Sequence, residues 1–308
     1  MRLLTIGSVA FDNIETPFGK AEGIVGGAAT FIAHSAAKFG TKVNLCAVIG
    51  EDFPQSEIDS LVAAGANIDG LETVKGGKSF SWTGKYHLDM NTRDTLATDL
   101  NVLADFDPTL PEHYTDSEYV MLGNLTPTVQ LNVLNQLKNP TFVAMDTMNF
   151  WIEIALDDLK KVFARVDMLM INDQEARLIT GEYSLRKAAR MIQELGPKYL
   201  IIKKGEHGAM LFHGDRMFFC PALPLEEIFD PTGAGDSFAG GFMGYLARTN
   251  DTSWENLKRA LVYGSCVASF SVEKFGTQRI QEITRRDIDD RMMEFFALIQ
   301  FDTHHHLK

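Results

Sequence analysis

Short apolar runs, rich in β-branched residues, alternate along most of the chain with segments whose apolar positions recur at helical spacing. Continuous apolar runs are typical of strands buried on both faces, so this alternation predicts βα units and a mostly parallel sheet covered by helices. The predicted strands are Leu3–Val9, Val43–Ile49, Tyr119–Leu122, Phe142–Met145, Met168–Ile171 and Leu200–Lys203. The predicted helices are Ala28–Lys38, Ser56–Ala64, Pro127–Leu137, Trp151–Phe163, Asp173–Ile179 and Leu185–Leu195.

The C-terminal part has a different pattern. Two strand patterns, Ala209–Phe212 and Met217–Cys220, surround a turn, and three helical patterns follow at Gly233–Arg248, Trp254–Ser271 and Arg285–Ile299. We find no internal repeat and no low-complexity linker, so the chain is expected to form one large α/β body.

One segment interrupts this order. Residues Lys78–Leu103 alternate aromatic and polar side chains, which is typical of a half-exposed strand or hairpin. A small sheet beside an active-site crevice would act as a lid. An edge extension of the main sheet explains the same pattern.

Composition limits the function classes. The chain has 308 residues and a net charge of −12, which argues against a broad nucleic-acid surface but leaves room for a small phosphate pocket. No run approaches a membrane span, and the acidic N-terminal stretch is a poor signal peptide. The three cysteines, Cys46, Cys220 and Cys266, lack metal-ligand spacing and are expected to be reduced thiols of a cytoplasmic protein. The tail Thr303–Lys308 contains three histidines, which are weak evidence for a metal site.

The strongest chemical signal is a glycine-rich turn, Asp230–Gly235, that leads into a helix. Glycines let the backbone approach a ligand, and a helix N-terminus offers free N–H groups to an anion. Asp236 places a carboxylate at this helix N-terminus, where an anion would otherwise bind. It is either a helix cap or a general base beside an anion hole, which would suit phosphoryl transfer.

Two other phosphate motifs are excluded. The Walker A pattern ends at Gly77–Ser79 but needs glycine where Glu72 stands, and the dinucleotide fingerprint needs glycine where Phe238 stands. No such glycine loop follows the first predicted strand either, which disfavours a dehydrogenase.

The segment Asp230–Phe242 (DPTGAGDSFAGGF) resembles the C-terminal signature of the ribokinase-like (PfkB) carbohydrate kinases. The resemblance extends over essentially the whole chain. Matching segments are Gly7–Asp12, Gly26–Gly27 with the following helix, Gly50–Asp52, Asn172–Glu175 and Lys204–Gly208. It implies a ribokinase-like three-layer α/β/α fold with a mostly parallel central sheet and a small β lid, from segments near 10–26 and 76–103, in a single domain over residues 1–308.

The resemblance also implies functional roles for these residues. Asp236 would be the base that activates an acceptor hydroxyl, with Gly233, Ala234 and Gly235 as the anion hole. Asn172 and Glu175 would organise Mg²⁺ and its waters; a strand-end turn and a first-turn helix acid are the structural alternatives. ATP would lie over Lys204, Gly205 and Gly208, and its adenine near Ala268, Val272 and Gly276. Many relatives bind K⁺ at the turn containing Asp230 and Thr232, and relatives often dimerise through the lid.

The acceptor is less well defined. The resemblance implies that Asp12, Gly26 and Gly27 contact it. Two asparagines that bind sugar in ribokinase-type members are replaced by Ala10 and Phe31, which puts ribose in doubt. Phe31 offers a face for a nucleobase or is an ordinary core residue. Trp82, Asn124 and Asn149 are further candidates, the last two at strand ends.

The sequence therefore predicts an ATP- and Mg²⁺-dependent kinase that phosphorylates a hydroxyl of a sugar or sugar-like molecule, with Asp236 as base. A nucleoside kinase of the same fold is the close alternative. A nucleotide-binding module that has lost catalysis is disfavoured by the intact Asp236, Asn172 and Glu175.

Overall fold

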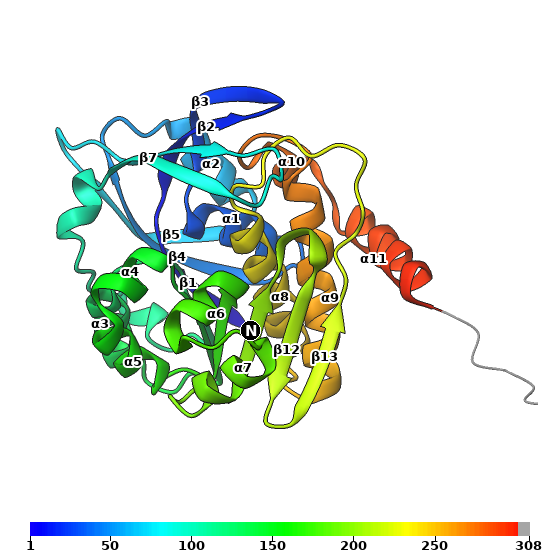
Figure 1. The fold of residues 1–308 in the computed structure, drawn as a ribbon. Helices are drawn as coiled ribbons and strands as arrows, with labels where there is room; N and C mark the ends of the chain where they lie inside the picture. Colours follow the sequence, from blue (N-terminus) through cyan, green and yellow to red (C-terminus); the bar gives the residue numbers. More distant parts are fainter. Residues whose placement is uncertain (301–308) are drawn as a thin grey trace, which may run out of the picture.

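Nine strands form the large sheet of the computed structural model, which describes residues 1–300 (Figure 1). The strand order is β13-β12-β11-β10-β9-β8-β1-β4-β5, parallel from β5 to β11, with β12 and β13 antiparallel at one edge. The strands are β1 (Arg2–Ile6), β4 (Lys42–Gly50), β5 (Ala66–Val74), β8 (Tyr119–Leu122), β9 (Phe142–Asp146), β10 (Met168–Asn172), β11 (Tyr199–Lys203), β12 (Ala209–His213) and β13 (Arg216–Cys220). The central strands are buried throughout, as continuous apolar runs require.

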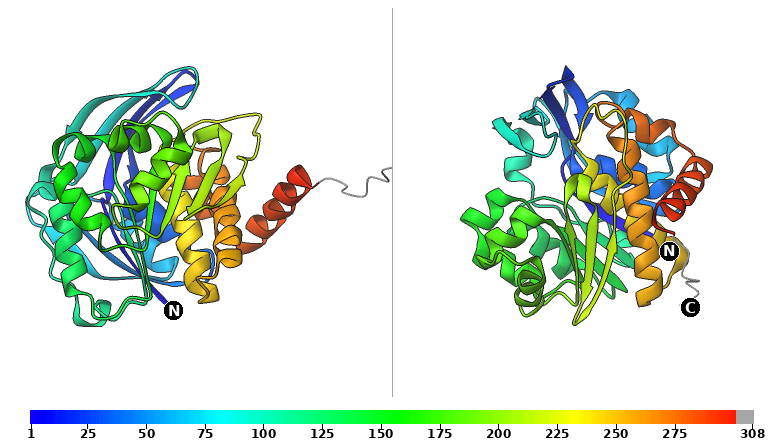
Figure 2. Two further views of the ribbon diagram at one scale, coloured as in Figure 1. Left: turned by 60° about the horizontal axis from the view of Figure 1, so that its bottom comes forward. Right: turned by 45° about the vertical axis from the view of Figure 1, so that its right-hand side comes forward.

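Helices cover both faces of this sheet, so the predicted three layers are confirmed (Figures 1 and 2). One apolar core lies under α1 (Ala28–Ala37), α2 (Gln55–Ala63), α8 (Ala234–Thr249), α9 (Trp254–Ser271), α10 (Gln278–Glu282) and α11 (Arg285–Ile299). The other lies under α3 (Pro127–Gln136), α4 (Asn149–Ile154), α5 (Leu156–Phe163), α6 (Asp173–Thr180) and α7 (Leu185–Gln193). Three short 3₁₀ helices are η1 (Asn101–Asp105), η2 (Glu112–Tyr114) and η3 (Gly205–His207). Across residues 1–300, no helix has the length and apolar character needed to span a membrane.

Four further strands form a second sheet, which we call the small sheet, at the top of Figure 1. They are β2 (Ala10–Thr16), β3 (Gly19–Gly26), β6 (Phe80–Tyr86) and β7 (Arg93–Asp99), in the order β3-β2-β6-β7. The segment expected to be a strand or hairpin thus forms the antiparallel β6–β7 hairpin, and β6 pairs with β2 in parallel. It is not an extension of the large sheet.

Two elements differ most from the sequence prediction. The first strand ends at Ile6 rather than Val9, because the chain turns there into the small sheet. The predicted helix Trp151–Phe163 is two helices, α4 and α5, with a break at Ala155, where φ is −141°. Two aspartates follow in the first turn of α5, where the helix dipole stabilises negative charge and favours a new helix start.

The site's position follows from the strand directions. The parallel strands have their carboxyl ends on the same side of the large sheet, and ligands of open α/β sheets bind just beyond these carboxyl ends. Asp146, Asn172 and Lys203 are the last residues of the adjacent strands β9, β10 and β11. The predicted tail histidines lie outside the described residues.

Candidate active site

The turn before α8 is held by a buried carboxylate. Asp230 is fully buried; its Oδ1 accepts a hydrogen bond from the Thr232 amide (2.8 Å) and its Oδ2 one from the Gly276 amide (3.1 Å). Gly233 follows in the left-handed region, with φ of +74°. Within residues 1–300, no side chain caps the N-terminus of α8, so Asp236 in its first turn is not a helix cap. The Ala234 N–H group donates to the Pro231 carbonyl at 3.3 Å, whereas the Gly235 N–H group makes no such bond within the described residues and is available to an anion.

Phe31 lies behind this turn rather than in an open pocket. Its side chain is 1% exposed, and a Cβ built on Gly233 would lie 2.2–2.5 Å from the Phe31 ring. Glycine is therefore required at position 233 for both its backbone conformation and its contact. Of the two alternatives predicted for Phe31, its burial supports a core residue that packs against the turn rather than a face for a nucleobase.

Asp236 lies in a cluster of charged groups. Burial raises its pKa, and the positive charges of Lys203 and Arg93 oppose that rise. Asp146, 4% exposed, lies close enough to Asp236 for the two carboxyl groups to influence each other's ionisation. Burial and the nearby Asp236 charge raise the pKa of Asp146 well above its ordinary value, so the pair resists carrying two negative charges.

Lys203 provides a positive charge next to the turn. Its Nζ atom lies 2.9 Å from the position that a Cβ on Gly235 would occupy. Its charge also lowers the pKa values of Asp146 and Glu175, against the effect of burial. A lysine in this place can stabilise negative charge that develops at the turn.

Asn172 and Glu175 form a capping box at the start of α6. Asn172 Oδ1 accepts from the Glu175 amide, and Glu175 Oε2 accepts from the Asn172 amide, both at 2.8 Å. The structural alternatives considered for both residues are thus present. Glu175 is 7% exposed, and burial raises its pKa; its Oε1 atom takes no part in the box.

The predicted ATP residues lie on two neighbouring loops. Lys204 closes a turn through its amide, which donates to the Gly208 carbonyl at 2.8 Å, and Gly208 (φ +90°) approaches the Cys220 carbonyl too closely for any side chain. Gly205 contacts the Asn91 side chain at the tip of the β6–β7 hairpin.

The second loop follows α9, where Ala268 is partly buried. The Val272 carbonyl accepts from the Phe229 and Asp230 amides, and Gly276 donates to Asp230. These contacts join the C-terminal loop to the glycine-rich turn, so the predicted residues of this region lie together.

Among the residues predicted to contact the acceptor, Asp12, Gly26 and Trp82 lie in the small sheet. Asp12 is 4% exposed and accepts from the Gly27 amide, and a Cβ on Gly26 would collide with its carboxylate. Burial, together with the negative charges of Asp230 and Asp236, raises the pKa of Asp12 to about 8. Trp82 is the register partner of Asp12 across β2 and β6, so both side chains lie on one face of the small sheet.

Asn124 and Asn149 differ in their surroundings. The Asn124 Oδ1 accepts from the Trp151 indole at 3.0 Å, and its Nδ2 donates to the Met148 sulfur at 3.1 Å. Asn149, at the start of α4, is exposed. The structure thus brings Asn124 into a fixed network and leaves Asn149 free at the rim.

Lys203 and Arg93, whose charges act on Asp236, were not assigned a role from the sequence. Tyr86 was expected only as a lid residue that closes on a sugar ring or packs on the body. Lys203 was available as a lysine at a strand end, next to the predicted Lys204. Arg93 and Tyr86 come from the β6–β7 hairpin, and only the folded chain places them near α8; the Tyr86 hydroxyl accepts from Thr232 Oγ1 at 3.1 Å.

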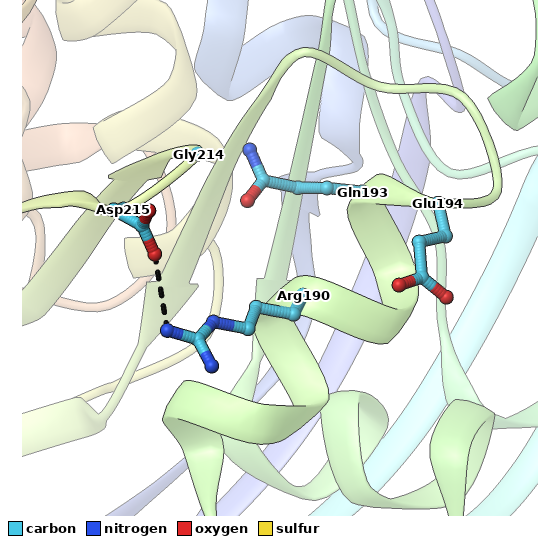
Figure 3. A pocket seen from close by; sticks show the side chains of 5 residues that line it. All are labelled: Arg190, Gln193, Glu194, Gly214 and Asp215. Atoms are coloured by element: carbon cyan, nitrogen blue, oxygen red, sulfur yellow. Dashed lines mark hydrogen bonds and ion pairs between the residues drawn. The ribbon is translucent and has the colours of Figure 1, made fainter.

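A surface hollow between α7 and the β12–β13 turn is separate from this site (Figure 3). Arg190 pairs with Asp215 there at 3.0 Å. Because β12 runs antiparallel to β11, this turn lies beside the amino end of β11, whereas Lys203 lies at its carboxyl end.

Comparison with known proteins gives the family. Residues 8–284 match the family described as pfkB family carbohydrate kinase. This chain belongs to that family. Members of the pfkB family transfer a phosphoryl group to a hydroxyl group, so the chain is a phosphotransferase of this kind.

Relatives in the pfkB family include kinases of nucleosides and of sugars. A cytidine kinase of Thermococcus kodakarensis is 35% identical over 251 residues, covering 80% of this chain and 88% of that protein. A nucleoside kinase of Methanothermobacter thermautotrophicus is 25% identical over 302 residues, covering 90% and 91%.

Solved structures share the fold. The nucleoside kinase of Burkholderia thailandensis in complex with inosine has a TM-score of 0.72 at 21% identity, covering 96% of this chain and 99% of that one. An E. coli putative ribokinase II in complex with ATP and Mg²⁺ has a TM-score of 0.76 at 19% identity, covering 95% and 99%.

Proposed function

We propose that this pfkB-family protein is a nucleoside kinase that transfers a phosphoryl group from ATP to a ribose hydroxyl of a nucleoside. The observation that carries the choice of acceptor is the apolar character of two positions that bind sugar in ribokinase-type members. Ala10 and Phe31, where sugar-binding asparagines are expected in ribokinase-type members, are 0% and 1% exposed. The cytidine kinase relative at 35% identity supports the same choice.

The acceptor pocket offers one strong polar group. The Asp12 carboxylate can accept hydrogen bonds from two ribose hydroxyls, which a nucleoside retains. Free ribose presents further hydroxyls that the two missing amides would bind, and a site lacking such partners discriminates against them. Trp82, beside Asp12 on β6, offers an indole to stack on the base.

The proton transfer is assigned to Asp236. Its carboxyl group lies in the first turn of α8, beside the buried Asp146 and the positive charges of Lys203 and Arg93. As the acceptor hydroxyl attacks phosphorus, Asp236 takes its proton. The N–H groups of Gly233, Ala234 and Gly235 hold the developing negative charge, and Lys203 and Arg93 reinforce them.

The site suits Mg²⁺ held largely through water. Among residues 1–300, no group of three or more acidic, histidine or cysteine side chains is close enough to enclose a metal ion. Asp146 Oδ1 is buried without a hydrogen-bond partner, and Glu175 Oε1 is outside the capping box. Mg²⁺ prefers few carboxylates, several waters and substrate phosphates, so these two carboxyl groups fit its outer environment. When bound, the ion neutralises charge on the transferring phosphoryl group.

A monovalent cation is proposed at Asp230. This carboxylate is fully buried, burial raises its pKa, and its two oxygens each accept one backbone N–H. A K⁺ ion beside Asp230 and Thr232 would neutralise the charge and stiffen the turn. Turnover in KCl is expected to exceed turnover in choline chloride, and equal rates would contradict this assignment.

The small sheet is proposed to act as the lid and as the contact between two copies. It is the part of the single kinase domain, residues 1–308, that carries Asp12 and Trp82. All residues of its edge strand β7 are exposed, which leaves backbone groups available for pairing.

The three cysteines are free and buried, which supports a cytoplasmic location.

The test is ADP release from ATP with a panel of nucleosides and sugars, run on the native protein and on Asp236→Asn. We expect turnover with nucleosides, and a loss of about 10³-fold in the variant while ATP binding is unchanged. Turnover with sugars alone would contradict the acceptor. Unchanged turnover of Asp236→Asn would contradict the role of the base.

A further inference from the structure

The small sheet packs directly on the two loops that hold the glycine-rich turn. Its buried residues Ile14, Tyr86 and Met90 form a cluster with Ile228 and Phe275, which flank Asp230 and Gly276 in sequence. A Cβ on Gly276 would lie 2.9 Å from the Val25 carbonyl of β3. The glycine-rich turn thus lies between the small sheet and the large body.

Tyr86 makes the polar link across this contact. Its side chain is 4% exposed, and its oxygen accepts a hydrogen bond from Thr232 Oγ1 at 3.1 Å. The Thr232 amide in turn donates to Asp230. Gly233 follows, with the Phe31 ring against it on the body side. The turn is therefore fixed by Phe31 from α1 and by Tyr86 from the small sheet.

A second contact joins the same hairpin to the other predicted ATP loop. The Asn91 side chain packs on Gly205, and its Nδ2 donates to Glu206 Oε1 at 3.5 Å. Asp89 holds the tip through the Asn91 and Thr92 amides. Tyr86 and Asn91, at the two ends of this segment, thus contact the glycine-rich turn and the predicted ATP loop Lys204–Gly208, respectively.

We propose that Tyr86 is a positioning residue for phosphoryl transfer: its hydrogen bond from Thr232 holds the glycine-rich turn so that the N–H groups of the anion hole are aligned. The inference rests on the proposed function, because it needs the turn to be the anion hole.

The test is Tyr86→Phe, which removes one oxygen atom and leaves the ring in place. We expect kcat with a nucleoside to fall about tenfold, with KM for the nucleoside changed by less than about twofold, because the variant misplaces the turn without touching the acceptor. We also expect Thr232→Val to lower kcat to a similar degree, and the double variant to be no worse than either single one.

Tyr119→Phe is the matched control. Tyr119 is also buried, and its hydroxyl donates to Asn250 Oδ1 at 3.1 Å. It lies at the amino end of β8, whereas the candidate active site lies at the carboxyl ends of the parallel strands. The melting temperature of the Tyr119→Phe variant is expected to fall as much as that of Tyr86→Phe, while the kcat of Tyr119→Phe is unchanged.

Three results would overturn the inference. The first is a kcat of Tyr86→Phe equal to that of the native protein, and the second is additive losses in the double variant. In both cases the native protein still phosphorylates nucleosides, so the proposed function stands. In the third, the native protein phosphorylates no nucleoside; the proposed function then fails, and the inference fails with it.

Discussion

Asp12 is a buried carboxyl group placed beside two other buried acids. Its pKa is raised to about 8, first by burial and then by the negative charges of Asp230 and Asp236. An acceptor hydroxyl binds best to the ionised form, whose lone pairs accept both hydrogen bonds. We therefore expect kcat/KM for the acceptor to rise with pH up to about pH 8.

The same group makes stability depend on pH. Between the ordinary pKa of 3.8 and the raised value of about 8, the folded protein holds a proton that the unfolded chain releases. The free energy of unfolding therefore falls as pH rises through this window. Asp12→Asn is expected to raise the melting temperature by on the order of 5 °C at about pH 8.5, and by less at about pH 5.

Thermal melts at both pH values check this, with the exposed Asp99→Asn as control. An equal gain at the two pH values would show that Asp12 is ionised in the folded protein throughout this range.

Lys203 and Lys204 are neighbours whose roles the structure separates. Lys203 Nζ lies against Gly235, whereas Lys204 contributes its backbone to the turn that contains Gly208. We expect Lys203→Met to lower kcat about 100-fold, because it removes charge stabilisation at the anion hole, and Lys204→Met to change it much less. Steady-state kinetics of the two variants decide, and equal effects would contradict the assignment.

At the scale of elements, the start of α8 depends on α1. Gly233 combines a φ of +74° with a position at which a Cβ would clash with the Phe31 ring. Gly233→Ala is expected to lower both kcat, by about 100-fold, and the free energy of unfolding, by about 2 kcal/mol, since it adds strain and a clash.

Phe31→Leu in the Gly233→Ala background separates these two causes. A smaller side chain should recover part of the stability, which chemical denaturation would measure, while the left-handed backbone remains strained. If the double variant is no more stable than Gly233→Ala alone, the clash with Phe31 contributes nothing to the loss of stability.

Most elements could be predicted because their patterns are strong. The central strands are continuous apolar runs, and α9 agrees with its predicted range, Trp254–Ser271. The break at Ala155 was not predictable from periodicity, since Ile152 and Leu159 keep one helical face across it. Strand β5 was missed because its side chains are mixed in polarity and its positions are half-buried or exposed except for the buried Ala66.

At the scale of the whole molecule, the turn with Asp236 was predictable because its residues are contiguous in sequence. The partners of Asp236 were not, because they come from separate elements: Asp146 from β9, Lys203 from β11 and Arg93 from β7. Phe31 could not be placed from the sequence, since a helix pattern does not tell which neighbour its side chain meets.

The central claim is that this pfkB-family chain phosphorylates nucleosides. The most direct measurement offers cytidine and ribose together, at equal concentration, with ATP and Mg²⁺, and identifies the phosphorylated products by mass spectrometry. We predict nucleoside monophosphate in excess over ribose phosphate by about 100-fold or more, because the site lacks the amides that bind a free sugar. Ribose phosphate as the main product would contradict the account.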